Sequence, residues 1–255
     1  VIAYPGAVIA ASHAQTGLLT GALLVLAAHE LGRRPALSGA AIGALAVKPH
    51  LAVLTPLWFA MGGRWRAFLS AALVLIALVV ASMLAFGSGI LAEYATSWRA
   101  SQALMEGINA DFLLRMSTFF SQARLLAGDT AASAAGALSA LVALAAAALS
   151  WRRFHGDAEA SGAAALAATA LVSPYMFNYD LPFLIFPTLW LIAQGLERGF
   201  RSFEKLGLVF LYLAPYATRA VAFPLGINLM PVAALALLAL VWSRGPRSPG
   251  TAAAP

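Results

Sequence analysis

Three uninterrupted apolar runs limit what this chain can fold into more than any other feature. They occupy residues 67–86, 130–149 and 223–242, and each has the roughly 20 apolar residues with which a helix crosses the hydrocarbon core of a bilayer. Of the 255 residues, 62% are hydrophobic and only 10% are charged, whereas soluble domains carry about 25% charged residues. Because a soluble fold has too little polar surface to cover so much apolar surface, the sequence predicts an all-α, polytopic transmembrane helix bundle.

Six further apolar segments are shorter or more polar than these runs. They span residues 17–31, 36–47, 50–62, 161–173, 181–196 and 206–218. Short or proline-broken helices are tolerated in a membrane where protein or a water-filled cavity satisfies their backbone. We therefore expect about nine short or full spans in a single transmembrane domain over residues 1–243, and a disordered cytoplasmic tail over residues 244–255.

The basic residues predict how the chain is oriented. They fall in small clusters between the apolar runs, a distribution typical of membrane loops rather than of a nucleic-acid-binding surface. The clusters are Arg33–Arg34, Arg64 with Arg66, Arg152–Arg153, Arg198 with Arg201 and Lys205, and Arg244 with Arg247. Because basic loops stay in the cytoplasm, the chain must cross an even number of times between clusters, and the apolar segments allow this. Residues 36–62 then form a hairpin that turns at Lys48-Pro49-His50, or one kinked span, and the last pair of spans turns near Arg219.

This topology collects polar residues on the outer face of the membrane. They are His13 and Gln15, Lys48 and His50, the segment 87–129, and Tyr175–Asp180. An ionisable residue between apolar runs costs about 2.5–3.5 kcal/mol on insertion scales, so Lys48 is a functional candidate, and its point charge suits a phosphate. The alternative is a lysine that snorkels to the interface from a hairpin tip. For His13 and Gln15 the alternative is a cap on the helix that follows.

The segment 87–129 is too long to be a passive linker. Its charged residues are spaced and interleaved with aromatic ones, which predicts one or two amphipathic helices lying at the membrane interface. Such helices either cover the bundle or form a lid over a lipid-linked substrate, with Arg115 or Arg124 on its phosphate.

A polar turn separates the apolar segments 161–173 and 181–196. Pro174 ends the preceding helix, and the aromatic residues beside it suit a membrane interface. Asn178 and Asp180 are functional candidates here, unless Asp180 caps the next helix. The chain has no cysteine, which excludes a disulfide or a thiolate metal site, and it has no dinucleotide, P-loop or zinc-protease motif. We therefore predict no cofactor and no metal.

At these residues the chain resembles glycosyltransferase family 87, a family of polyprenyl-phosphate-dependent membrane enzymes with the GT-C fold. The resemblance runs in order over roughly residues 1–240. It is carried by Ala14-Gln15-Thr16-Gly17, Arg34-Pro35 through Lys48-Pro49-His50, Gly63-Arg64-Trp65-Arg66-Ala67, Ser117 through Arg124-Leu125-Leu126, and Ser173-Pro174-Tyr175 with Tyr179-Asp180-Leu181. Ser12-His13 departs from the glycine that the family favours before the glutamine.

The resemblance implies transfer of a hexose, often mannose, from a polyprenyl-phosphate carrier to a glycolipid or glycan acceptor at the external face of a bacterial plasma membrane. It also implies a catalytic aspartate in an early external loop. Because the chain opens at Val1 inside an apolar stretch, we expect it to be the C-terminal portion of such an enzyme, with the base upstream. The expected substrate-binding residues are His13, Gln15, Lys48, His50, Arg124, Asn178, Tyr179 and Asp180.

Two other functions remain open from the sequence. A secondary transporter or flippase of a polar lipid is the main alternative, although such proteins often contain internal repeats and paired broken helices at the midplane. We find no internal repeat, and the polar residues gather at one face. A non-catalytic membrane scaffold would leave Lys48 and the segment 87–129 unexplained.

Overall fold

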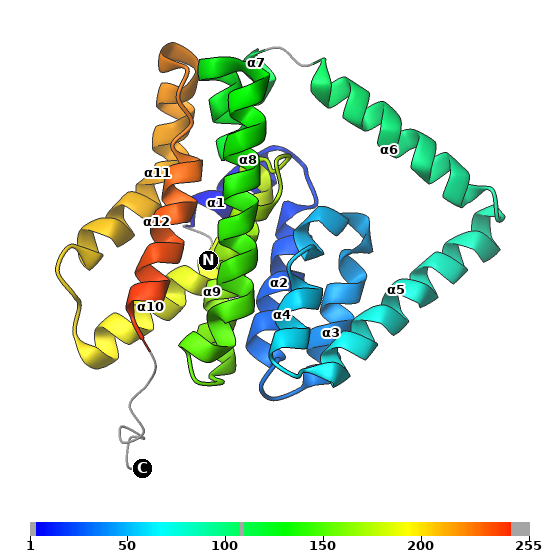
Figure 1. The fold of residues 1–255 in the computed structure, drawn as a ribbon, viewed down its shortest axis with the longest axis horizontal. Helices are drawn as coiled ribbons and strands as arrows, with labels where there is room; N and C mark the ends of the chain where they lie inside the picture. Colours follow the sequence, from blue (N-terminus) through cyan, green and yellow to red (C-terminus); the bar gives the residue numbers. More distant parts are fainter. Residues whose placement is uncertain (1–3, 108–109, 246–255) are drawn as a thin grey trace.

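The computed structural model describes residues 4–107 and 110–245, and Figure 1 shows that this part of the chain is built from helices. The N-terminal elements are α1 (Pro5–Ser12), α2 (Gly17–Glu30), α3 (Pro35–Gly43), η1 (Ala44–Val47), η2 (Pro49–Ala52), α4 (Thr55–Met61), α5 (Trp65–Phe86) and α6 (Ile90–Glu106). The later elements are α7 (Ala110–Leu113), α8 (Phe119–Arg153), α9 (Ala158–Val172), η3 (Asn178–Leu184), α10 (Ile185–Arg198), α11 (Glu204–Leu225) and α12 (Met230–Ser243). The elements labelled η are 3₁₀ helices.

Several of these helices have the length and composition of membrane spans. Within the described ranges, four stretches are long and apolar enough to cross a membrane: Trp65–Phe86, Phe119–Arg153, Asn178–Arg198 and Glu204–Leu225. Shorter apolar helices, among them α2, α9 and α12, complete the bundle. The chain is therefore an all-α helical membrane bundle, as the apolar runs predict.

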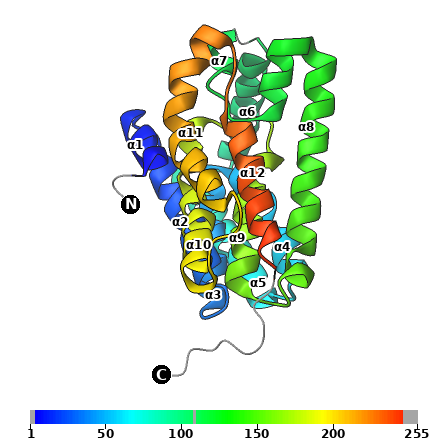
Figure 2. The ribbon, with the colours of Figure 1, turned by 90° about the vertical axis from the view of Figure 1, so that its left-hand side faces the viewer.

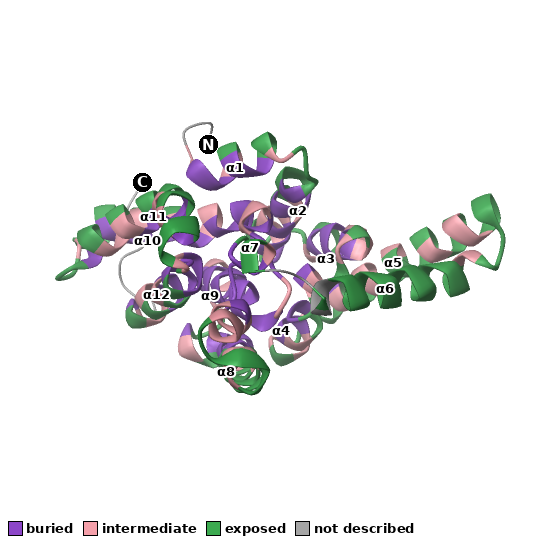
Figure 3. Ribbon diagram, turned by 90° about the horizontal axis from the view of Figure 1, so that it is seen from above, coloured by how far each residue is buried: buried purple, intermediate pink, exposed green. Residues whose placement is uncertain are grey.

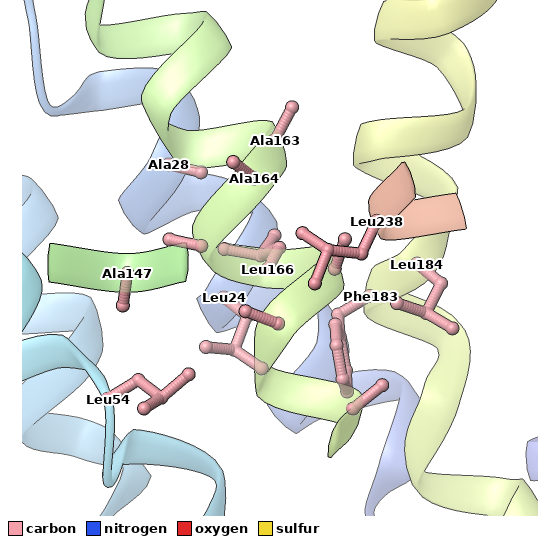
Figure 4. Packing of buried hydrophobic residues seen from close by; sticks show 14 of the residues in the cluster. Leu24, Ala28, Leu54, Ala147, Ala163, Ala164, Leu166, Phe183, Leu184 and Leu238 are labelled. Atoms are coloured by element: carbon pink, nitrogen blue, oxygen red, sulfur yellow. The ribbon is translucent and has the colours of Figure 1, made fainter. Parts of the chain in front are cut away.

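Helix α9 forms the centre of the bundle. Its residues from Ala160 to Val172 are all buried, which is expected of a helix that is apolar on every side. Helices α2, α8, α10 and α12 pack around it. Figure 4 shows Leu24, Leu54 and Phe183 gathered around α9 from the neighbouring elements. The small alanine side chains of α9 let five helices meet with little space between their backbones.

Helix α2 packs unusually close to the 3₁₀ helix η3. A Cβ atom on Gly17 would collide with the carbonyl oxygen of Tyr179, and one on Gly21 would lie 3.1 Å from the Cβ of Pro182. Glycine at these positions is what allows such close approach of two backbones in a membrane protein. The turn that carries Asn178, Tyr179 and Asp180 is therefore held directly against the start of α2.

Helices α5 and α6 form an arm that leaves the bundle. In Figure 1, α5 leans away from the other helices and α6 runs back toward α7. Gly87, with a φ of 84°, follows α5 at the turn between them. Figure 3 shows α6 exposed along nearly its whole length. The segment 87–129 thus contains α6, α7 and the first turns of α8, which kinks at Gly128 (φ 82°). Its contact with a membrane interface stays a prediction.

The structure settles two details of the predicted spans. Residues 36–62 form two short helices, α3 and α4, joined by η1 and η2 on either side of Lys48. They therefore form the hairpin, which was one of the two predicted alternatives, and not a single kinked span. The prediction of a turn near Arg219 was wrong. Helix α11 continues to Leu225, and the turn follows at Gly226, whose φ is 67°. Because the Arg219 side chain is exposed on the surface of α11, its charge does not interrupt the helix.

The basic clusters, apart from Arg247, which lies outside the described residues, gather at one end of the bundle. Arg33 pairs with Glu159 at 4.0 Å, the Arg64 guanidinium lies 4.8 Å from the Trp151 ring, and Arg153 donates to the carbonyl oxygen of Trp242 at 2.9 Å. Arg244 forms a buried ion pair with Glu204, while Arg201 donates to the carbonyl oxygen of Ser243. The tail predicted over residues 244–255 lies outside the described residues beyond Gly245.

Candidate functional site

A cavity of about 430 Å³, lined by both polar and apolar side chains, lies between α1, α11, the segment that precedes α8 and the start of η3. Helix α1 contacts both η3 and α11, and Figure 2 shows it beside α11 at the edge of the bundle. The residues that line the cavity are Ile9, His13, Gln15, Phe112, Leu114, Arg115, Phe177, Asn178, Tyr179, Thr218, Arg219, Ala222 and Phe223. Four of the predicted site residues are among them: His13, Gln15, Asn178 and Tyr179.

Two arginines give the cavity its charge. Arg115 comes from the segment before α8 and Arg219 from α11. Over residues 4–107 and 110–245 neither forms an ion pair, and Arg115 lies over the Phe223 ring at 5.8 Å. Carboxylates are likewise missing from the described lining residues, so the cavity carries uncompensated positive charge that suits an anion. Sequence reasoning did not select Arg219, because it placed that residue in a turn.

A short backbone pairing joins two walls of the cavity. Met116 and Phe177 form an isolated antiparallel bridge, in which Ser117 N donates to Met176 O at 2.8 Å and Asn178 N donates to Arg115 O at 3.2 Å. Arg115 and Asn178 therefore hold a fixed relation to each other. Asn178 itself lines the cavity, and its side-chain oxygen is buried with no hydrogen-bond partner in the described protein.

Aromatic rings line the cavity between these polar groups. Phe177 and Tyr179 stack with their ring centroids 5.1 Å apart and their planes within 3°, and the His13 ring lies 5.6 Å from that of Tyr179. The Nδ1 atom of His13 lies 2.8 Å from the carbonyl oxygen of Ile9. Since a carbonyl oxygen only accepts, this contact requires a proton on Nδ1.

Lys48 and Asp180 form an ion pair directly behind Tyr179. The Lys48 Nζ atom donates to Asp180 Oδ1 at 2.5 Å and lies 5.1 Å from the centre of the Tyr179 ring. The other carboxylate oxygen accepts from Phe177 N at 3.2 Å. The Asp180 side chain is only 2% exposed and the Lys48 side chain 16% exposed. Asp180 thus caps η3, and the pair ties the η1–η2 hairpin tip to the turn that carries Asn178 and Tyr179.

Comparison with known proteins identifies the chain's family. The model of glycosyltransferase family 87 matches residues 1–176. The chain belongs to glycosyltransferase family 87. No curated protein and no solved structure matches it. The protein is therefore a membrane glycosyltransferase, which acts on a sugar donor and an acceptor. The matched region contains Arg115 but ends before Asn178 and Arg219, so the cavity also draws on the part of the glycosyltransferase beyond the match.

The remaining predicted site residues lie outside the cavity lining. Arg124 pairs with Asp129 at 2.7 Å, near the kink in α8. His50 follows the hairpin tip, and its Nε2 atom is buried without a hydrogen-bond partner among the described groups. A second, apolar pocket of about 250 Å³ lies between the α3–α4 hairpin and α5. Ala46 and Pro49, on either side of the hairpin tip, are among the residues that line it.

Proposed function

We propose that this glycosyltransferase binds a polyprenyl-phosphate hexose, with mannose as the expected sugar, in the cavity that Arg115 and Arg219 line. The observation that carries this proposal is the pair of guanidinium groups, which have no ion-pair partner in the described structure. Guanidinium groups bind phosphate oxygens through paired, charge-assisted hydrogen bonds. A neutral polar substrate would leave both charges uncompensated.

The other lining residues suit a sugar. The amide side chains of Gln15 and Asn178 belong to the lining, and an amide both donates to and accepts from hydroxyl groups. The stacked rings of Phe177 and Tyr179 offer apolar surface for the carbon face of a hexose. The apolar pocket beside α5, close to Lys48, is suited to part of an isoprenoid chain.

The reaction also needs a base for the acceptor hydroxyl. Among the described residues that line the cavity, none is a carboxylate, and Asp180 is buried in its pair with Lys48. We therefore retain the proposal that an aspartate outside this chain is the base. In this proposal Lys48, His50 and Asp180 support the donor site from behind Tyr179.

The activity itself is tested in the full-length protein, reconstituted in liposomes with a radiolabelled polyprenyl-phosphate mannose and a glycolipid acceptor. We expect label to move from the carrier to the acceptor. The alternative, a transporter or flippase, predicts label that changes leaflet while it stays on its carrier. Movement across the bilayer without transfer would overturn the proposal.

We also propose that the basic end lies in the cytoplasm and the cavity opens toward the external face. Because the chain has no cysteine, single cysteines report this cleanly. Gly107 follows α6 and is exposed, with room for a side chain at ordinary contact distances, and Glu197 is exposed near the basic end. In intact cells a membrane-impermeant maleimide should label Gly107→Cys, and should label Glu197→Cys only after the membrane is opened. The opposite pattern would reverse the orientation.

A further inference from the structure

The turn between α11 and α12 contains a buried amide that reaches across to the cavity wall. Asn228 is 3% exposed. Its side-chain nitrogen donates to the carbonyl oxygens of Leu114 and Met116, both at 2.9 Å. These are the two residues that flank Arg115. Both amide protons are therefore used on the segment that presents one of the two cavity arginines.

The same turn is also tied to the other arginine. The backbone nitrogen of Leu229 donates to Thr218 Oγ1 at 3.1 Å, and Thr218 directly precedes Arg219 on α11. Gln122 adds a brace from α8: its Oε1 accepts from Asn228 N at 2.7 Å, and its Nε2 donates to Gly226 O at 3.0 Å. One turn thus bonds to residues directly beside both arginines in the chain.

We propose that Asn228 is a positioning residue that fixes Arg115 at the distance from Arg219 at which both engage one phosphate. This inference rests on the proposed function of the cavity. Two guanidinium groups from separate segments bind one phosphate well only if the protein fixes their positions before the phosphate binds. A displacement of about 1 Å greatly reduces the activity of a catalytic site. A buried amide with both protons donated to fixed carbonyl oxygens supplies such a constraint.

The test is Asn228→Ala in the full-length protein, assayed with polyprenyl-phosphate mannose. We expect the KM for the donor to rise about tenfold while kcat stays within about twofold, because the lost interaction holds phosphate in both the ground state and the transition state. In the double variant with Arg115→Ala, we expect no loss beyond that of Arg115→Ala alone, since residues that act as a unit are non-additive. Losses that multiply, or an unchanged donor KM, would overturn the inference.

Two further variants separate positioning from folding. Ser139→Ala removes another interhelical bond, from Ser139 Oγ to Leu171 O at 2.7 Å, and should lower thermal stability without changing the donor KM. Asn228→Ser keeps an oxygen that accepts from Met230 N, lacks the amide group that bonds to Leu114 and Met116 and buries no charge, so it carries the test if Asn228→Ala does not fold. If Arg115→Ala itself leaves the donor KM unchanged, the phosphate site fails and this inference with it. If Arg115→Ala raises the donor KM, but the losses from Arg115→Ala and the Asn228 variant multiply in the double variant, only the inference fails.

Discussion

Replacing Arg115 and Arg219 by alanine is expected to reduce kcat/KM for the polyprenyl-phosphate donor by about 10- to 100-fold for each single variant. A hydrogen bond to a charged group contributes about 1.5–3 kcal/mol, and about 1.4 kcal/mol corresponds to a tenfold change. The double variant should lose more than either single one. The measurement is initial-rate transfer over a range of donor concentrations, with the amount of folded protein determined by gel filtration in detergent.

The control for this experiment is Arg152→Ala. Arg152 is an exposed arginine at the basic end of α8, so its loss removes the same charge from the chain without touching the cavity. Arg115→Lys adds a second comparison, since lysine keeps the charge but lacks the planar fork that matches phosphate, and it should recover part of the activity. Near-normal donor KM and kcat in both alanine variants would rule out the cavity as the phosphate site.

The helices of the protein follow from features that the sequence carries locally. Runs such as 67–86 and 130–149 become α5 and the long part of α8, because a continuous apolar stretch of about 20 residues has no stable alternative in a bilayer. The residues at which the helices begin and end depend less on the local sequence. Arg219 looks like a loop residue in the sequence, yet it lies inside α11, since one exposed charge does not break a helix.

The candidate site depends on contacts that no local pattern contains. The sequence selected His13, Gln15, Asn178 and Tyr179 as polar residues on one face, and the structure brings all four to one cavity. The bridge between Met116 and Phe177, and the bonds from Asn228 to the carbonyls beside Arg115, join segments far apart in the chain. Only the packed bundle determines these pairings, so Arg219 and Asn228 were beyond sequence reasoning.

Removing the charge of Lys48 is expected to destabilise the protein more than removing the charge of its partner. Lys48→Met leaves the Asp180 carboxylate buried, and among the described groups the bond from Phe177 N remains to stabilise it. Breaking a buried pair in this way costs about 3–5 kcal/mol. Asp180→Asn keeps an oxygen for Phe177 N, while the flexible Lys48 side chain can move its ammonium toward water. The midpoint temperature of thermal unfolding in detergent should therefore be higher for Asp180→Asn than for Lys48→Met.

The double variant Lys48→Met with Asp180→Asn decides whether the pair acts through its charge or through the turn it holds. Because the double variant buries no charge, we expect it to recover most of the stability lost in Lys48→Met. If the pair only supports the turn that carries Asn178 and Tyr179, transfer should recover with stability. If the Lys48 ammonium itself contacts the donor phosphate, transfer stays low in a protein that is folded and stable.

Asp129→Asn is the matched control, since its carboxylate is 80% exposed and such a pair contributes about 0–1 kcal/mol. Wild-type stability in Lys48→Met would contradict the buried ion pair on which both explanations depend.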